Sequence, residues 1–490
     1  MEEEYDGNEC KKSRCYAWFI CGVSFTVQFM AMSFFGSFGP LYVELLRVFK
    51  EGDAKTAWVA SISFSICFLV SPITYRIDER IGQRKTMMIG SVLFGLGLFL
   101  SSFANSLSLL FVTIGVLVAI GHSFCQAASM FVLPHFFGNN YAMPLGIALS
   151  GASTGALALS SLKELIFRKF AFKMGMQILS GTALILLLCG ITFKPPKAKT
   201  LKSENSRRRD SIDERYPPLQ KNKAFQLLLL ASFVYHSVYL VTYVHLTRLA
   251  GDLGISDTKA ALLPGFVAIM ESVGKVCAGK FISLFDSKCL TLYQSSWLGM
   301  AISTFLCPLA TGFTGLALYA VGWGFCVGAA AGSCVPVIRY LVGNRNVIRA
   351  YSIFLMCFSP AVLAGPPLAG WLREKTHSYD VALYVTGTNF AVASAMIFLV
   401  KLFDRMQRKT YFDQPNPFNV GEDDAESCEE KDPSDADKKS IVNTEIDFNL
   451  IHQDTKKEKN DRHEDLIEEF HCNLERSQGK KLLPAKETDL

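Results

Sequence analysis

The sequence predicts an all-α polytopic membrane protein with twelve transmembrane helices arranged in two six-helix bundles. Half of the 490 residues are hydrophobic, only 19% are charged, and the mean hydropathy is +0.26 despite a heavily charged C-terminal region. Runs of about 20 apolar residues recur between Tyr16 and Phe403, and each can cross a hydrocarbon core of about 30 Å as a helix. One charged connection divides these runs into two sets of six, which indicates two bundles.

The first six spans form the predicted N-terminal bundle, residues 16–193, after a charged N-terminal segment at 1–15. The first apolar run is too long for a signal peptide and lacks a small-residue cleavage site, so we expect it to remain in the mature protein. Hydropathy and helix breakers place the spans near 16–46, 56–76, 86–104, 107–133, 141–163 and 175–193.

A polar connection at 194–223 leads into the predicted C-terminal bundle, residues 224–403. Residues 404–490 are rich in Asp, Glu and Lys and poor in aromatics, so they bury too little apolar surface to offset the entropy of ordering. We therefore expect a disordered, charged cytoplasmic tail. The spans of this bundle are predicted near 224–249, 258–283, 288–308, 312–339, 349–372 and 381–403.

Positive charges beside the spans predict that both termini are cytoplasmic. An even number of crossings places both termini on one side, and Lys and Arg concentrate on the cytoplasmic side of membrane proteins. The loop between spans five and six departs from this bias, since it is basic from Lys163 to Lys173. The residues that set the orientation are Lys11, Lys12, Arg14, Arg76, Arg80, Arg84, Lys85, Arg207, Arg208, Arg209, Arg405 and Arg408.

Composition also excludes several classes of function. The 14 cysteines show no C-x-x-C spacing, so neither a metal site nor a disulfide framework is indicated. The net charge of +5 comes with basic residues beside spans, which argues for topology rather than nucleic-acid binding. We expect no cofactor and no enzymatic chemistry.

Two charges interrupt predicted span eight in the stretch AIMESVGKVCAG, residues 268–279. At about 1.5 Å per residue, Glu271 lies near the middle of the bilayer. A lone charge there costs roughly 3 kcal/mol on insertion scales. Glu271 and Lys275 are spaced i, i+4 with the acid first, so they share a helix face and partly neutralise each other. A structural ion pair that holds span eight against a neighbour is the alternative to a functional site.

The stretch DERIGQRK, residues 78–85, connects predicted spans two and three. It resembles the acidic-Arg-x-Gly-x-basic signature that the major facilitator superfamily places at a tight cytoplasmic turn. This resemblance implies a gating turn, and Gly82 permits the turn because it has no side chain. An ordinary basic inside loop is the alternative. The residues concerned are Glu79, Arg80, Gly82, Arg84 and Lys85.

Nearly the whole region 16–403 resembles the monocarboxylate transporter family of that superfamily. The most specific matches are TAWVASI at 56–62, LGISDTKAALL at 253–263, GPPLAGWL at 365–372 and SYDVALYVTG at 378–387. The resemblance implies the major facilitator fold, two six-helix bundles that alternate access to a central substrate site, in the plasma membrane.

The chain is a divergent member by this comparison, because its signature motifs have lost charge. The family opens span one with an acidic-Gly-x-aromatic-small-Trp pattern, of which only the aromatic end remains, at Tyr16 to Trp18. The Tyr-Phe-x-Lys-Arg-Arg opening of span five aligns with 136–141 and has lost its basic cluster. The first-span lysine that helps bind a carboxylate in lactate-type members aligns with Gly36. The Phe-Gly-Trp-Arg stretch after span five aligns with 170–173, where Lys173 keeps the charge.

Small residues are retained where charge is lost. Gly146 and Gly151 survive from the span-five motif, and GWGFCVGAAAG at 322–332 repeats glycines at four-residue intervals. Small residues let transmembrane backbones approach, so these stretches predict close helix packing.

The family carries an acid and an arginine in span eight, so the resemblance assigns Glu271 and Lys275 to the substrate and proton path. Arginine binds a carboxylate with two parallel hydrogen bonds, whereas lysine acts as a point charge. A lysine site therefore tolerates more kinds of anionic or zwitterionic group. Polar and aromatic residues of other spans and loops are weaker candidates, each with ordinary packing as the alternative. They are His122, Gln126, Phe34, Phe38, Tyr42 and Lys173.

We therefore expect a secondary transporter that moves a small monocarboxylate-type organic anion or zwitterion, with symport of protons as one option. One alternative is proton-independent facilitated transport of a larger amphipathic or amino-acid-like solute, and another is a non-transporting sensor or scaffold acting through the tail. The expected partners are the substrate, protons, the lipid bilayer and a single-span escort protein.

Two soluble features suggest regulation. Ser211 follows three arginines in RRRDSID, a basophilic kinase pattern, and a phosphate there adds about −2 charge beside the membrane. The chain ends in Thr488, Asp489 and Leu490, a terminus that a PDZ domain binds as an added strand. Chance occurrence is the alternative for both.

Overall fold

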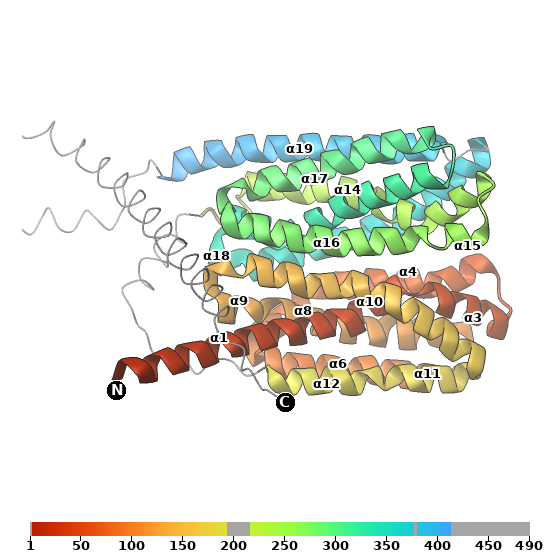
Figure 1. Ribbon diagram of the computed structural model, residues 1–490, viewed down its shortest axis with the longest axis horizontal. Helices are drawn as coiled ribbons and strands as arrows, with labels where there is room; N and C mark the ends of the chain where they lie inside the picture. The colour runs from red at the N-terminus through yellow and green to blue at the C-terminus, as the bar shows by residue number, and fades with distance from the viewer. Residues whose placement is uncertain (1, 194–215, 377–379, 413–490) are drawn as a thin grey trace, which may run out of the picture. The chain divides into compact units, whose positions relative to one another are not determined.

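The computed structural model describes residues 2–193, 216–376 and 380–412, and every regular element there is helical. Seven of these helices are each long and apolar enough to cross a membrane, and a bent pair, Lys55–Leu69 with Ser71–Ile81, makes an eighth. α16 differs from these helices in carrying three charged residues, Glu271, Lys275 and Lys280. Across the described ranges, with α18 divided at Gly343, the helices form twelve crossings (Figure 1).

The first half of the chain supplies six crossings, and short π-helical or 3₁₀ turns interrupt two of them. In chain order its elements are α1 (Glu2–Val27), η1 (Gln28–Met32), α2 (Ser33–Gly36), α3 (Gly39–Phe49), α4 (Asp53–Leu69), α5 (Ser71–Ile81), α6 (Gln83–Ser101), α7 (Leu107–Val112), η2 (Thr113–Val118), α8 (Ala119–Phe131), α9 (Leu133–Phe137), η3 (Gly138–Asn140), α10 (Ala142–Lys169), α11 (Phe172–Ser180) and α12 (Thr182–Thr192).

The first crossing is broken, whereas the sequence predicted one uninterrupted span at 16–46. Ser37 leaves the helical region with φ −110° and ψ 34°, and α3 restarts with Pro40 in its first turn. Pro40 has no N–H to continue the preceding helix, which favours a new start at this point. The helix also begins at Glu2, well before the predicted start at residue 16.

The helices have two ends, and we name each end after a turn that lies there. α3 ends at Lys50, which has φ 52°, and we call that end the Lys50 side. α5 and α6 meet at Gly82, which has φ 82°, and we call that end the Gly82 side. A positive φ favours glycine because an L side chain is strained there, so Gly82 gives the tight turn that the sequence predicted.

The second half supplies the other six crossings. Its elements are α14 (Lys223–Asp252), α15 (Asp257–Ala260), α16 (Leu263–Leu284), η4 (Asp286–Lys288), α17 (Cys289–Leu306), η5 (Cys307–Leu309), α18 (Phe313–Thr376) and α19 (Asp380–Phe412). The side chain of Asn222 caps α14 by accepting from the N–H of Phe225 at 3.0 Å. α18 contains two predicted spans joined at Gly343, where φ 77° bends the chain.

Glycines let helices within each half approach closely. Gly90 of α6 and Gly121 of α8 face each other's helix backbones, and a Cβ at either position would overlap them. Gly151 and Gly155 of α10 lie in the same way against Phe25 and Phe29 of the first crossing. The retained small residues of span five therefore pack helices together, as the sequence predicted.

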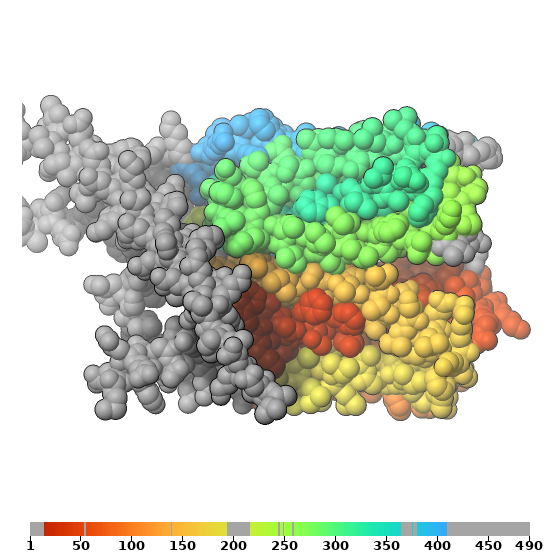
Figure 2. All heavy atoms as spheres, viewed as in Figure 1, coloured from red at the N-terminus to blue at the C-terminus, as the bar shows by residue number. Residues whose placement is uncertain are grey.

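The two halves meet along α10 with α16, and along α4 and α5 with α18. Figure 2 shows α16, in green, lying directly against α10, in orange. Toward the Gly82 side, Ser65 and Ser359 bring their Oγ atoms within 2.7 Å, and Ser71 donates to the carbonyl of Ser352 at 2.8 Å. Polar contacts as well as apolar packing therefore join the halves.

The outer helices expose large apolar side chains. α12 exposes Leu184 and Leu188, and α17 exposes Leu298, Ile302 and Leu306. Lipid tails are as apolar as these side chains, so the pattern fits faces that contact a membrane.

Candidate functional site

Glu271 and Lys275 form a buried ion pair on α16. Lys275 Nζ lies 2.7 Å from Glu271 Oε1, and the two side chains are 6% and 12% exposed. The i, i+4 spacing on one helix produces this contact directly. The two charges neutralise each other, which lowers the cost of holding either one away from water.

Lys275 also reaches across to the first half of the chain. Its Nζ donates to Ser153 Oγ at 2.6 Å and to the carbonyl of Leu149 at 3.3 Å, both on α10. Charge-assisted bonds of this kind are stronger than neutral ones. The ammonium therefore joins the two halves at the same point where it meets Glu271.

Glu271 is held from the other side by α14. Tyr243 Oη donates to Glu271 Oε2 at 2.9 Å, and Tyr239 Oη in turn donates to Tyr243 Oη at 3.4 Å. A continuous chain of polar groups thus runs from Tyr239 through the ion pair to Ser153. It spans α14, α16 and α10, and so includes both halves.

Glycines bring the backbones of α10 and α18 against the pair. A Cβ at Gly328 would lie 2.8 Å from the Cα of Glu271, and one at Gly332 would lie 2.8 Å from the carbonyl of Lys275. Gly146 of α10 faces that same carbonyl. The glycine-rich stretch 322–332 is therefore a packing surface for the helix that carries the charges.

Aromatic rings surround Tyr239 and Tyr243, at one end of the series of hydrogen-bonded groups. Trp323 packs edge-on against Tyr243, with ring centroids 5.1 Å apart, and its Nε1 has no partner among the described residues. His236 meets Phe358 edge-on at 4.1 Å, and Phe358 meets Phe68 of the other half at 4.5 Å. The site thus offers one ion pair amid mostly apolar and aromatic walls, the usual make-up of a small-molecule site.

His122 and Gln126 lie inside the first half, and no described bond joins them to Glu271 or Lys275. His122 Nδ1 lies 2.7 Å from Cys67 Sγ, and its ring meets Phe35 edge-on at 4.9 Å. The other ring nitrogen, Nε2, is buried with no partner in the described chain. Gln126 is buried on the next turn of α8.

One aromatic candidate of the first crossing, Phe34, contacts a different cation. Phe34 and Phe38 are buried, and Lys163 Nζ lies 4.1 Å above the Phe34 ring. Tyr42 is half-buried on α3, and the exposed Lys173 lies over Phe103 at 4.7 Å. These residues lie toward the Lys50 side, apart from the pair.

Gly36 has no room for the lysine that the resemblance places there. A Cβ at Gly36 would lie 2.9 Å from Ala156 Cβ on α10. Lys163 of α10 instead brings an ammonium to the break in the first crossing. Gly36 lacks the lysine of the family, and the ammonium of Lys163 lies beside it, bonded to Phe34 and Ser37.

The turn residues lie on the Gly82 side. Glu79, Arg80, Arg84 and Lys85 are exposed, and within the described chain no ion pair joins them to one another. The predicted regulatory residues Ser211, Thr488 and Leu490 lie outside the described residues. No group of three or more potential metal ligands occurs in the part of the chain that the structure describes.

Comparison with known proteins assigns the family. The profile described as Major Facilitator Superfamily matches residues 24–295, more than half of the chain. The chain belongs to the Major Facilitator Superfamily. Among its relatives, monocarboxylate transporter 13 of Rattus norvegicus is 27% identical over 388 residues, which cover 79% of this chain and 90% of that protein. Monocarboxylate transporter 10 of Danio rerio is 29% identical over 399 residues, which cover 78% and 77%. The predicted resemblance is confirmed.

Solved structures of the superfamily show the same fold. FucP in the outward conformation matches with a TM-score of 0.60 and 15% identity, over 79% of this chain and 99% of FucP. The human organic anion transporter MFSD10 matches with a TM-score of 0.60 and 13% identity, over 78% and 99%. The predicted all-α, two-bundle membrane fold is confirmed.

Sequence reasoning missed Tyr243 and Ser153, the residues that hold the two members of the pair. Tyr239 and Tyr243 stand i, i+4 in an apolar span, a spacing that places two hydroxyls on one helix face. Ser153 stands between Gly151 and Gly155 and carries no comparable signal. Its role depends on how α10 meets α16.

Proposed function

We propose that this protein is a secondary transporter of the plasma membrane that moves a small organic anion or zwitterion by alternating access. The observation that carries the proposal is the buried pair Glu271–Lys275, which is bonded to α10 as well as α14. A solute bound at this pair would contact both halves. Membership of a transporter superfamily, with monocarboxylate transporters among the relatives, supports this reading.

In the proposed mechanism, Lys275 binds the carboxylate of the substrate, and Glu271 compensates the charge of Lys275 when no substrate is bound. A substrate carboxylate can replace Glu271 as the partner of the ammonium, and the charges in the site then balance when Glu271 takes up a proton. Protonation of Glu271 would weaken its hold on Lys275 and would couple proton binding to substrate binding. Tyr243 keeps the Glu271 carboxylate in place during this exchange.

Proton-independent transport of a larger or amino-acid-like solute is the second candidate. The packing of Gly36 against Ala156 favours it, because this excludes the first-span lysine of lactate-type members. Uptake measured at pH 6 and pH 8 separates the two candidates. Proton symport predicts faster uptake at the lower external pH, and facilitated transport predicts no such dependence.

The test is uptake by cells or proteoliposomes that contain the full-length protein, using a panel of labelled lactate, pyruvate, 3-hydroxybutyrate and zwitterionic amino acids. Glu271→Gln and Lys275→Gln should each abolish uptake of the solute found, and Lys275→Arg should retain it. The double variant Glu271→Gln, Lys275→Gln decides whether the pair has a structural role or binds the substrate. A structural pair leaves no stranded charge when both members are removed, so parental uptake in the double variant would overturn the assignment.

We also propose that the Gly82 side is cytoplasmic, together with both termini, because basic residues concentrate there. Epitope tags at either end should stain only after permeabilisation. Staining of intact cells would reverse the topology.

A further inference from the structure

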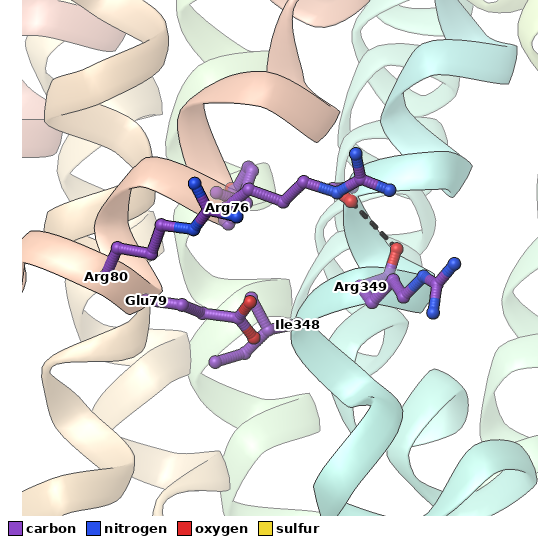
Figure 3. A pocket seen from close by; sticks show the side chains of 7 residues that line it. Arg76, Glu79, Arg80, Ile348 and Arg349 are labelled. Atoms are coloured by element: carbon purple, nitrogen blue, oxygen red, sulfur yellow. Dashed lines mark hydrogen bonds between the residues drawn. The ribbon is translucent and has the colours of Figure 1, made fainter.

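A cavity of about 300 Å³ opens on the Gly82 side between the two halves of the chain. α5 lines it with Tyr75, Arg76, Glu79 and Arg80, and α18 lines it with Arg349 and Ser352 just beyond the bend at Gly343. Figure 3 shows the Arg76 side chain extending from α5 toward α18, where Arg349 lies. The cavity is separate from the Glu271–Lys275 pair and shares no residue with it.

The cavity carries an excess of positive charge. Three guanidiniums and one carboxylate line it, a net charge of +2. No ion pair within the described residues involves Arg76, Arg80 or Arg349. Figure 3 shows Glu79 directed toward Ile348. The guanidiniums therefore keep their donors available to a ligand.

Tyr75, one of the lining residues, packs against rings from both halves. Tyr75 packs edge-on against Tyr351 at 5.9 Å and against Phe131 at 5.3 Å. Ser71 and Ser352 join α5 to α18 just beside this layer. The cavity therefore lies next to the contact between α5 and α18. Its two walls belong to different halves, so they separate when that contact opens.

We propose that this cavity binds a phosphate-bearing anion that joins the two halves and favours the state closed on the Gly82 side. A guanidinium donates two parallel bonds to phosphate oxygens, and a phosphate group carries about −1.5 to −2 charge at pH 7, which matches the cavity. A ligand that contacts both halves only when they are together shifts the equilibrium toward that state. The ligand is either a soluble phosphate compound or a phosphorylated lipid headgroup. This proposal goes beyond the transport function and does not depend on it.

The experiment follows thermal unfolding of the purified full-length protein in detergent. The probes are inorganic phosphate, ATP and short-chain phosphatidylinositol 4,5-bisphosphate, each compared with sodium chloride at equal ionic strength. Binding to the folded state should raise the unfolding temperature in a saturable way. A response to phosphate or ATP indicates a soluble ligand, and a response to the lipid alone indicates a headgroup. No response beyond that to sodium chloride overturns the proposal.

Variants that change the charge of the cavity test whether the anion binds there. Arg76→Gln and Arg349→Gln should each raise the half-saturating probe concentration at least tenfold. Glu79→Gln should lower it several-fold, because it removes the one negative charge of the cavity, and this opposite sign cannot arise from damaged folding. Lys280→Gln, an exposed charge of α16 outside the cavity, is the matched control and should change nothing. Equal loss in Lys280→Gln and the arginine variants, or no change in Glu79→Gln, would refute the site.

Discussion

At the scale of single residues, the chain holds a buried ion pair by giving each charge a second partner. Tyr243 holds the acid at 2.9 Å and Ser153 holds the base at 2.6 Å. A buried charge that loses a partner keeps its desolvation cost, so each second partner affects both stability and function. The two partners come from different halves of the chain, and their removal should therefore have separable effects.

Tyr243→Phe should lower uptake of the identified solute about tenfold, because a hydrogen bond to a charged group contributes about 1.5–3 kcal/mol. Uptake is normalised to the amount of protein at the surface. Tyr319→Phe is the matched control, since its buried hydroxyl meets Thr242 at 2.8 Å instead of the pair. Equal uptake by Tyr243→Phe and the parent would remove Tyr243 from the site.

Ser153→Ala removes the hydroxyl that Lys275 bonds on α10 and should raise the apparent KM several-fold, because the ammonium loses its fixed position. Ser150→Ala is the control, one turn earlier on the same helix, where the hydroxyl donates to the carbonyl of Ile147 and, among the described residues, to no group of the pair. Concentration dependence of uptake distinguishes the two. If both variants shift KM alike, the effect belongs to α10 packing and Ser153 has no specific role.

At the scale of elements, glycines let helices near the site approach closely, and a lysine bonds to the groups at the break in the first crossing. α16 approaches α18 at Gly328 and α10 at Gly146, where no side chain fits. Lys163 Nζ donates to the carbonyl of Phe34 at 2.9 Å and to Ser37 Oγ at 2.9 Å. An ammonium at the carbonyl end of a helix is favourable, and here it satisfies groups that the break leaves free.

Gly328→Ala should destabilise the protein by about 1–3 kcal/mol, the usual cost of overpacking, because the added methyl meets the backbone of Glu271. The matched control is Gly322→Ala on the same helix, whose Cβ would meet only Ser303 Oγ at 3.5 Å. Thermal unfolding of the purified proteins compares them. Parental stability of Gly328→Ala would show that α16 and α18 adjust without cost.

Lys163→Met keeps an unbranched side chain, one atom shorter, and removes its donors, so it should destabilise the protein by about 1–3 kcal/mol. Lys169→Met, an exposed lysine at the end of α10, should have little effect. The readouts are the unfolding temperature and surface yield. An unchanged Lys163→Met variant would mean that the break at Ser37 forms without this cap.

At the scale of the whole molecule, the proposed alternating access requires the contact between α4 and α18 to open. Ser65 and Ser359 meet within 2.7 Å, and Phe68 packs on Phe358 beside them. A bond that cannot break at this point should stop turnover while the protein stays folded. The two positions are 294 residues apart in sequence and adjacent in space.

The double variant Ser65→Cys, Ser359→Cys should lose uptake after mild oxidation and recover it after reduction. Each single variant, with all native cysteines retained, controls for other disulfides. Cross-linking is followed by mass spectrometry of the linked peptides. Full uptake by the cross-linked protein would show that this contact stays closed throughout transport.

The sequence alone determined the fold class, the approximate spans and the charged pair. Apolar runs of bilayer length must become helices, because lipid offers no partner for backbone N–H and C=O groups. The pair was visible because two charges i, i+4 apart in an apolar run share a helix face wherever that helix packs.

Only the tertiary structure decided which groups complete the site. Ser153 stands 122 positions before Lys275, and Tyr243 stands 28 before Glu271, so their contacts depend on which helix faces meet. The bonds made at the break near Ser37 and the lining of the arginine cavity also involve long-range neighbours, namely Lys163 of α10 and Arg349 of α18. The local sequence pattern determines which residues share a face of one helix. The register between two helices depends on side chains from both, so it cannot be predicted from either span alone.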